Sequence, residues 1–377
     1  MNGPAEGKRS AMRILHLCDQ NWVGTASTFV KMHRRFGHES RMVTLARCRE
    51  GYDEDICLHL PFVKGSRLDM RLKDVVARIH GNRRKWTTEQ DLRVWRPRSP
   101  VEATLFRLRD RLWERRIWEA VERHDLLNFD IYHLESGIGF FRDSRILRDL
   151  KCRGKKIVCY YLGTDLRDRG VIPEVDALSD LNLTCEFDHL GLHPDIRFFY
   201  MPFETEPFRP KSGGGGDRVR ICHAPRNRRF KGSDIIIRQV RELETDYPVE
   251  LVLIEGMSHE DALATKMTCD IAIDQVGDMG GVGYGVNSLE TLSMEMATCT
   301  QMRSDLEAFM PDHPFVNVNR ENLKAKLVEL VEKPELRESK GREGREWVVK
   351  HHDAASVVQD LYRLYGKMGW MREDPKT

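Results

Sequence analysis

The fold is indicated most directly by the segment Val219-Arg-Ile-Cys-His223-Ala-Pro-Arg-Asn-Arg228-Arg-Phe-Lys231-Gly232-Ser233-Asp234. Its apolar start predicts a buried strand over residues 219–223, and the spacing of apolar residues after Gly232 predicts a helix over 233–243. Gly232 permits a tight turn between them, and Ser233 or Asp234 is placed to cap the helix. A strand that passes through a polar turn directly into a helix is half of a βαβ unit.

The same alternation runs through most of the chain. Further strands are predicted at 12–18, 41–45, 130–134, 156–162, 198–201, 249–254 and 271–274, and further helices at 29–36, 142–151, 259–267, 287–296 and 354–371. Because parallel strands need helical crossovers, this rhythm predicts parallel sheets of the α/β class. Gly37 follows the first helix as a C-cap.

One glycine run divides the chain. Pro210-Lys-Ser-Gly-Gly-Gly-Gly-Asp217 has the composition of a flexible linker, and the strand–helix rhythm restarts after it. We therefore predict an N-terminal Rossmann-like domain over 12–205, a linker over 206–217, a C-terminal Rossmann-like domain over 218–355, and a C-terminal helix and tail over 356–377. The two domains are expected to face each other across a cleft, with ligands beyond the carboxyl ends of the strands.

Residues 64 to about 125 depart from the rhythm and predict a helical insertion in the first domain. Arginines there outnumber acidic residues, and Trp86, Trp95, Trp113 and Trp118 lie among them. Such a segment suits an amphipathic face on anionic lipid. Because exposed arginines are common, the sequence favours the other interpretation, an ordinary solvated helical hairpin whose tryptophans pack on the domain.

Composition narrows the class of protein. The chain has 377 residues, a net charge of +2 and nine scattered cysteines without a Cys-x-x-Cys pair. That usage predicts reduced core thiols and neither a disulfide framework nor a metal site. The first eleven residues lack the apolar stretch of a signal peptide, and the longest apolar runs are strand-length. A cytoplasmic protein is expected, with no nucleic-acid partner.

Two loops carry the candidate chemistry. Arg228 and Lys231 stand three residues apart at a helix entrance, where a planar guanidinium fork, a point charge and the helix end together suit a diphosphate. An exposed basic turn is the other interpretation.

The second loop is Gly277-Asp-Met-Gly-Gly281-Val-Gly-Tyr-Gly-Val-Asn287-Ser-Leu-Glu290, again between a strand and a helix. Glycines let the backbone approach an anion, and the amides at the helix start can bind phosphate. Asn287 or Ser288 is the expected N-cap. Glu290 could accept hydrogen bonds from ribose hydroxyls, or it could complement the helix dipole.

These loops, the strand at 270–274 and Phe203-Glu-Thr-Glu-Pro-Phe-Arg-Pro210 together make residues 12–365 resemble the GT-B glycosyltransferases of the family 4 type, the glycosyl transferases group 1 domain. The resemblance implies a transferase that takes a sugar from a nucleotide-diphosphate sugar, with retention and without a metal or other cofactor. It implies that Arg228 and Lys231 hold the diphosphate and that Glu290 binds the ribose. The donor-binding residues implied are Gly24, Thr25, Arg228, Lys231, Gly281, Gly283, Tyr284, Gly285, Asn287, Ser288 and Glu290.

The N-terminal half supplies the candidates for the acceptor side. Gly163-Thr-Asp165-Leu-Arg167 resembles a His-Gly-Ser-Asp-Leu-Arg stretch of the family, and Asp165 could orient or deprotonate an acceptor hydroxyl. Capping the following helix is an equally good account of Asp165. His133 and Glu135 are weaker candidates near the preceding strand end. The catalytic set implied is Asp165, Arg228 and Lys231, with the donor phosphate helping to deprotonate the acceptor.

Three departures from the family pattern keep other functions open. Leu162 stands in place of a histidine, Val282 in place of a glutamate, and Glu295 in place of a glycine. A hexosyltransferase acting on a glycan or lipid-linked acceptor in polysaccharide biosynthesis is the leading hypothesis, in the cytoplasm or at the inner membrane face. A nucleotide-sugar epimerase of the same fold and a non-catalytic nucleotide- or glycan-binding relative are the alternatives. A dinucleotide oxidoreductase is disfavoured, because no Gly-x-Gly-x-x-Gly follows the first strand.

Overall fold

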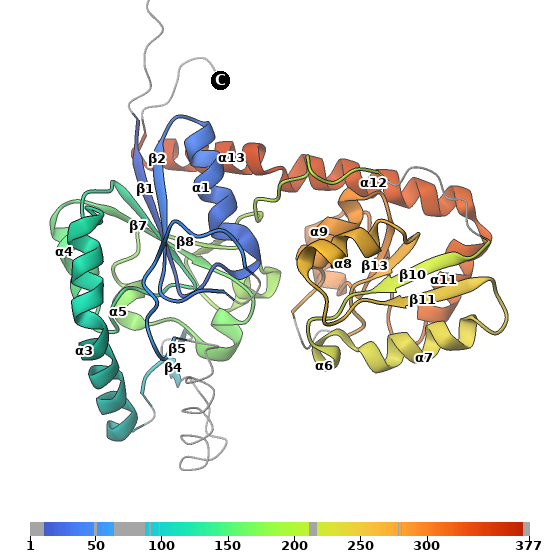
Figure 1. Ribbon diagram of the computed structural model, residues 1–377, viewed down its shortest axis with the longest axis horizontal. Coiled ribbons are helices and arrows are strands. Elements are labelled where there is room, and N and C mark those ends of the chain that lie inside the picture. Colours follow the sequence, from blue (N-terminus) through green and yellow to red (C-terminus); the bar gives the residue numbers. More distant parts are fainter. Residues whose placement is uncertain are drawn as a thin grey trace, which may run out of the picture. The chain divides into compact units, whose positions relative to one another are not determined.

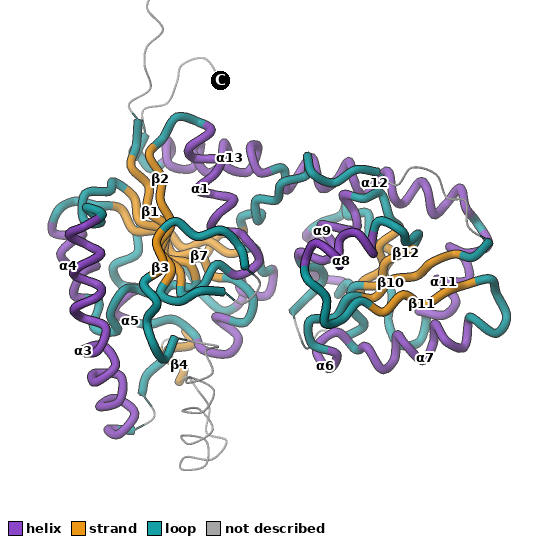
Figure 2. Tube along the Cα trace, viewed as in Figure 1, coloured by secondary structure: helices purple, strands orange, loops and turns teal. Residues whose placement is uncertain are grey.

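The computed structural model describes residues 11–48, 51–63, 87–89, 92–97, 99–210, 217–277, 279 and 281–371. The chain forms two compact units. One comprises Met1–Cys185 and His189–Phe199, and the other comprises Glu186–Asp188 and Tyr200–Thr377. Each unit is built on its own sheet, drawn as orange strands in Figure 2.

The first unit contains a seven-stranded parallel sheet in the order β3-β2-β1-β6-β7-β8-β9 (Figure 1). Its strands are β1 (Arg13–Cys18), β2 (Glu39–Thr44), β3 (Ile56–Cys57), β6 (Ile131–Glu135), β7 (Lys156–Tyr161), β8 (Leu181–Thr184) and β9 (Ile196–Phe198). Strand β1 lies between β2 and β6. Strands β2 and β3 are therefore added on one side of β1, and strands β6 to β9 on its other side. In such sheets the loops after the two central strands diverge, which is where ligands usually bind.

Helices surround this sheet, and buried strand residues such as Leu15, Tyr132 and Ile157 form its core. The helices are α1 (Thr25–Arg35), α3 (Pro100–Arg123), α4 (Arg145–Cys152) and α5 (Pro173–Asp176), with short turns η1 (Trp22–Gly24), η2 (Asp165–Arg169) and η3 (Phe187–Gly191). The first helix begins four residues before the predicted start, because Gly24, at φ 75°, serves as its N-cap.

The predicted insertion is described only in part, because Trp86 and the rest of 64–86 lie outside the described residues. The remainder contains the predicted helix, α3, and a two-stranded antiparallel ribbon that the sequence did not predict, β4 (Thr87–Glu89) with β5 (Leu92–Val94). The C-terminal half of α3 packs into the core through Trp113 and Ile117. Trp113 Nε1 donates to the carbonyl of Pro61 (2.8 Å), and Trp95 and Trp118 are partly buried. The described tryptophans therefore pack on the domain.

The second unit contains a five-stranded parallel sheet in the order β11-β10-β12-β13-β14. Its strands are β10 (Val219–His223), β11 (Val249–Leu253), β12 (Ile271–Ile273), β13 (Ala297–Thr300) and β14 (Val316–Asn317). Here β10 lies between β11 and β12, so the loops after β10 and β12 diverge as those of the first unit do. They are the two loops singled out from the sequence.

The helices of the second unit cover both faces of the sheet, with α7 and α11 on one face and α8 and α9 on the other (Figure 1). They are α6 (Arg228–Lys231), α7 (Ser233–Leu243), α8 (His259–Lys266), α9 (Val286–Ser293), α10 (Ser304–Phe309), α11 (Leu323–Glu332), α12 (Pro334–His352) and α13 (Ala354–Lys367). The two parallel sheets confirm the predicted α/β class. No helix in the described parts of the chain combines the length and apolar composition that spanning a bilayer requires.

Candidate functional site

The turn after β10 is a single helical turn whose ends the sequence dictates. Asn227 caps α6, accepting from the amides of Arg229 (3.0 Å) and Phe230 (3.3 Å). Gly232 ends it at φ 65°, and a Cβ there would lie 2.0 Å from the carbonyl oxygen of Val276. Only glycine fits, which holds Lys231 against the end of β12. The capping prediction was wrong, because Gly232 is the N-cap of α7 and Ser233 Oγ bonds His223 Nε2 (2.8 Å).

Arg228 and Lys231, the two cations predicted to hold the diphosphate, have acidic partners. Arg228 makes a bidentate pair with Glu255, Nε to Oε1 at 2.8 Å and Nη2 to Oε2 at 2.5 Å. Lys231 Nζ donates to Asp274 Oδ1 (2.8 Å) and Gln275 Oε1 (3.1 Å). The Arg228 side chain is 51% exposed and that of Lys231 21% exposed, so one partner pair is at the surface and the other is largely enclosed.

The glycine-rich loop also meets Asp274. Asn287 Nδ2 donates to its Oδ1 (3.1 Å) and Ser288 Oγ to its Oδ2 (2.8 Å). These two residues were predicted as N-caps of α9, but the N-cap is Gly285. Their side chains instead fix the helix to the end of β12. Burial would raise the pKa of Asp274, yet the Lys231 ammonium and these hydrogen bonds lower it, so the carboxylate is ionised at neutral pH.

In the rest of the glycine-rich loop, backbone carbonyl groups accept hydrogen bonds from neighbouring side chains. Gly281 O accepts from Gln275 Nε2 (2.9 Å) and Gly283 O from Thr300 Oγ1 (2.6 Å). Asp278 and Gly280 of the predicted motif lie outside the described residues. Tyr284 turns toward the end of α12, where its hydroxyl bonds His352 Nε2 (3.0 Å) and its ring stacks on Phe315. Tyr284 therefore anchors the loop through its side chain.

Glu290 is buried between two cationic groups. His259 Nε2 lies 2.8 Å from its Oε1, and the buried Lys266 pairs with its Oε2. Burial would raise the pKa of Glu290, but His259 and Lys266 lower it below its ordinary value. The residue lies beyond the first turn of α9, so it does not serve as the first-turn acid predicted as the alternative.

In the first unit, Gly24 and Thr25 form the start of α1 at the carboxyl end of β1, and Thr25 is buried. Asp165 follows β7 and is also buried. Its Oδ2 accepts from the backbone amide of Leu162 (3.1 Å), so it caps the end of the preceding strand. The N-cap of η2 is Thr164, and the prediction that Asp165 caps the following helix was therefore wrong.

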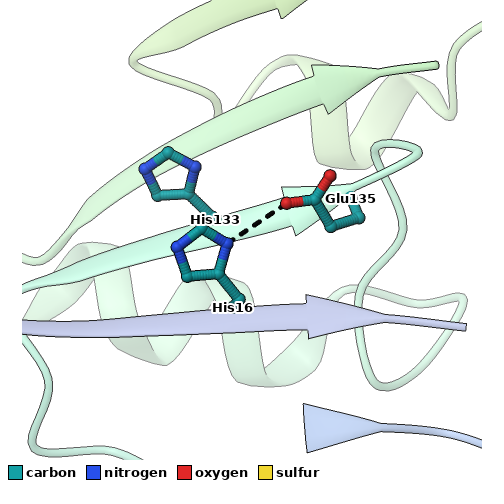
Figure 3. A group of neighbouring side chains, drawn as sticks. All are labelled: His16, His133 and Glu135. Atoms are coloured by element: carbon teal, nitrogen blue, oxygen red, sulfur yellow. Dashed lines mark hydrogen bonds and ion pairs between the residues drawn. The ribbon is translucent and has the colours of Figure 1, made fainter. Parts of the chain in front are cut away.

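A cluster of His16, His133 and Glu135 lies at the β1–β6 pair (Figure 3). Their ligand atoms lie within 4.8 Å of one another, a donor set that suits transition metals. The two rings, however, are stacked with centroids 4.4 Å and planes 24° apart. An imidazole binds a metal along a direction in its own plane, so stacked rings do not aim at one ion. As arranged, the cluster does not fit a shared metal.

Burial favours the uncharged forms of His16 and Glu135. It lowers the pKa of His16 to about 3 and raises that of Glu135 to about 8, with Asp165 and Asp19 raising the latter further. A protonated Glu135 then donates to Nδ1 of neutral His16 across 3.2 Å. Glu135 Oε2 has no hydrogen-bond partner within the described residues.

With this geometry in view, comparison with solved structures decides the fold. A structure of Anabaena Alr3699/HepE in complex with UDP and glucose superposes with a TM-score of 0.56 at 9% identity, covering 94% of this chain and 99% of that one. Trehalose-6-phosphate synthase superposes with a TM-score of 0.57 at 10% identity over the same shares. The chain has the GT-B glycosyltransferase fold. No family model matches the sequence, and no curated protein matches it either.

One departure from the family pattern, Glu295, can now be placed in this fold. Glu295, where the resemblance expects glycine, lies at φ 59°, a conformation that glycine adopts at less cost. Its carbonyl oxygen lies against α12, where a Cβ on Gly341 would come within 2.0 Å of it. The close packing of the turn after α9 against α12 therefore depends on Gly341.

We expect Gly341→Ala to lower the free energy of unfolding by about 2 kcal/mol, because the added methyl meets a backbone oxygen that cannot rotate away. Urea denaturation measures this. Gly344→Ala on the same helix is the matched control, since its Cβ would meet only the side chain of Leu292. Equal effects of the two variants would contradict the packing argument.

Sequence reasoning missed four functional candidates: Glu255, His259, Lys266 and Asp274. Only Asp274 carried a readable signal, an acidic residue directly after a buried strand and before a glycine-rich loop. It joins the two predicted loops of this GT-B fold, because Lys231 from one loop and Asn287 and Ser288 from the other all bind it.

Proposed function

We propose that this chain is a glycosyltransferase that moves a sugar, of the hexosyl type, from a nucleotide-diphosphate sugar to a glycan or glycoconjugate acceptor. One observation carries the proposal. The cationic turn α6 and the glycine-rich start of α9 both contact Asp274, beside the β10–β12 switch point of a GT-B unit. A guanidinium, an ammonium and a helix start gathered there suit a diphosphate.

Arg228 and Lys231 are proposed to hold the donor diphosphate and to stabilise its negative charge as it leaves. Lys231 is already held by Asp274 and Gln275, so it presents its charge in a fixed place. Arg228 is more exposed and would grip two phosphate oxygens with its planar fork. Two such cations supply the charge that a metal supplies elsewhere, and we propose a metal-independent reaction.

The loop and α9 are proposed to complete the donor site. Gly281, Gly283 and Gly285 would let the backbone approach the phosphates, with Tyr284, Asn287 and Ser288 fixing the loop's position. Glu290 would accept hydrogen bonds from the ribose, because an ionised carboxylate has more lone pairs than His259 and Lys266 occupy.

In the first unit, we propose that Asp165 lies next to the reacting acceptor hydroxyl and that Gly24 and Thr25 contribute to donor binding, since all three follow carboxyl strand ends of that unit. Retention is proposed because the family resemblance implies it, and because the GT-B neighbour trehalose-6-phosphate synthase is described for glycosyltransfer with retention. In such a reaction the donor phosphate helps to deprotonate the acceptor hydroxyl, with Asp165 orienting it.

A lipid-linked acceptor would bring the protein to the inner face of a membrane. The described tryptophans do not offer such a contact, but Val101, Leu108 and Leu112 of α3 are exposed beside several arginines. This face of α3 is therefore where a peripheral membrane contact is to be sought, by sedimentation with anionic and neutral vesicles.

We expect a panel of UDP-, GDP- and ADP-sugars to contain at least one that raises the melting temperature of the protein. Arg228→Ala is expected to weaken binding of that nucleotide at least about tenfold, because it removes charge-assisted hydrogen bonds to phosphate. Calorimetric titration measures the affinity, and mass analysis of products with candidate acceptors measures transfer.

A second variant, which removes Lys231, completes this test. Lys231 is best removed together with its partner, as Lys231→Met with Asp274→Asn, so that no buried carboxylate is left unpaired. Binding that neither Arg228→Ala nor the double variant changes would reject the site. Donor turnover without an acceptor would favour an epimerase of this fold, and binding without any turnover would favour a non-catalytic relative.

A further inference from the structure

Glu255 occupies the guanidinium fork that the donor diphosphate is proposed to use. It follows β11, in the loop where Gly256 turns the chain at φ 67°. Both of its carboxylate oxygens bond Arg228, at 2.8 and 2.5 Å. Hydrogen bonding from Arg228 lowers the pKa of this carboxyl, which is ionised at neutral pH. This pair uses the Nε and Nη2 edge of the guanidinium and neutralises its charge, so a phosphate competes with Glu255 for that edge and for that charge.

The same loop also reaches the other end of the proposed donor site. His259, at the start of α8, bonds Glu290 Oε1 at 2.8 Å. The segment 255–259 therefore supplies partners to both Arg228, proposed for the diphosphate, and Glu290, proposed for the ribose. A donor that takes the Nε–Nη2 edge of Arg228 must replace the carboxylate of Glu255, and a donor that takes the Nη1–Nη2 edge meets a cation that Glu255 already neutralises.

A second arginine–glutamate pair joins strands β10 and β11 at their other end. Arg220 of β10 binds Glu250 of β11, Nε to Oε2 at 3.2 Å, and both side chains are partly exposed. Arg220 and Glu250 lie near the amino ends of these parallel strands, whereas Arg228 and Glu255 lie beyond their carboxyl ends. In GT-B units of this kind, ligands bind at the carboxyl ends. The Arg220–Glu250 pair is thus a matched reference.

We infer that Glu255 is a specificity-determining residue: its carboxylate neutralises Arg228 and competes with the donor diphosphate for that guanidinium, which sets how tightly the site holds phosphate. This inference rests on the proposed function. Because the competing pair is exposed, its effect is moderate. Removing the charge of Glu255 should strengthen diphosphate binding about two- to fivefold.

Calorimetric titration of the full chain with a nucleoside diphosphate and with the corresponding nucleoside tests the inference. We use the nucleotide selected by the thermal-shift panel. Glu255→Gln is expected to tighten diphosphate binding by the stated factor and to leave nucleoside binding unchanged. Glu250→Gln, which changes the net charge of the protein equally, is expected to leave both unchanged. In an Arg228→Ala background, Glu255→Gln is expected to have no effect.

The outcomes separate the two claims. If wild-type protein binds the diphosphate and Arg228→Ala weakens that binding, but Glu255→Gln leaves it unchanged or weakens it, the inference fails while the proposed site stands. Equal tightening by Glu250→Gln would also overturn it, since net charge would then be the cause. Failure of every nucleoside diphosphate to bind the wild-type protein would overturn both.

Discussion

Lys266→Met is expected to lower the free energy of unfolding by about 3 kcal/mol. Lys266 is buried on α8 and pairs with the buried Glu290 of α9, so its removal leaves a carboxylate with much of its charge uncompensated. His259 remains as a partner at the edge of the pair, which keeps the expected loss at the lower end for buried ion pairs. Chemical denaturation at pH 7 measures the loss.

The double variant Lys266→Met with Glu290→Gln separates this cause from lost packing. It removes both charges and keeps side chains of similar size, so stability should return to within about 1 kcal/mol of wild type. If the double variant is as unstable as Lys266→Met, the loss comes from packing around Lys266. The electrostatic account of Glu290 would then be wrong.

Glu135→Gln is expected to stabilise the protein increasingly as pH rises from 5 to 8. The folded-state pKa of Glu135 is raised from 4.5 to about 8, chiefly by burial. Between these values the folded state keeps a proton that the unfolded state releases, so the wild type loses stability as pH increases. Glutamine carries no charge and removes this loss. The gain should be near zero at pH 4.5 and about 4 kcal/mol at pH 8.

The difference in unfolding free energy between Glu135→Gln and wild type, measured across this pH range, isolates Glu135 from every other titrating group. A rising difference is expected. A difference that stays flat from pH 5 to 8 would mean that Glu135 is ionised throughout in the folded state. The neutral pairing with His16 described above would then be incorrect.

Much of the fold could be predicted because its signals are local. Strand β10 and helix α7 have their predicted bounds, since a compact apolar run and a glycine mark them. Strands β8 and β13 were missed, because Leu-Asn-Leu-Thr and Ala-Thr-Cys-Thr carry no clear apolar run and are buried only through neighbouring strands.

The N-cap residues of two helices were also predicted wrongly. Glycines in left-handed or extended conformations begin α1, α7 and α9, where polar caps were expected for the last two.

The candidate site, too, could be predicted only in part. The two loops were visible as motifs, but their partners were not, because ion pairs join residues far apart in sequence. Arg228 and Glu255 are 27 positions apart, and Lys231 and Asp274 are 43 apart. No local pattern announces such pairs. They follow from the order β11-β10-β12, which brings three strand ends together.

The central claim is that the pyrophosphate of a nucleotide lies on the Arg228–Lys231 turn. It is tested most directly by comparing the affinities of one nucleoside diphosphate and its monophosphate for wild-type protein and for Arg228→Ala. The account predicts that wild type prefers the diphosphate by about tenfold or more and that Arg228→Ala loses most of this preference. A preference of equal size in both proteins would contradict it.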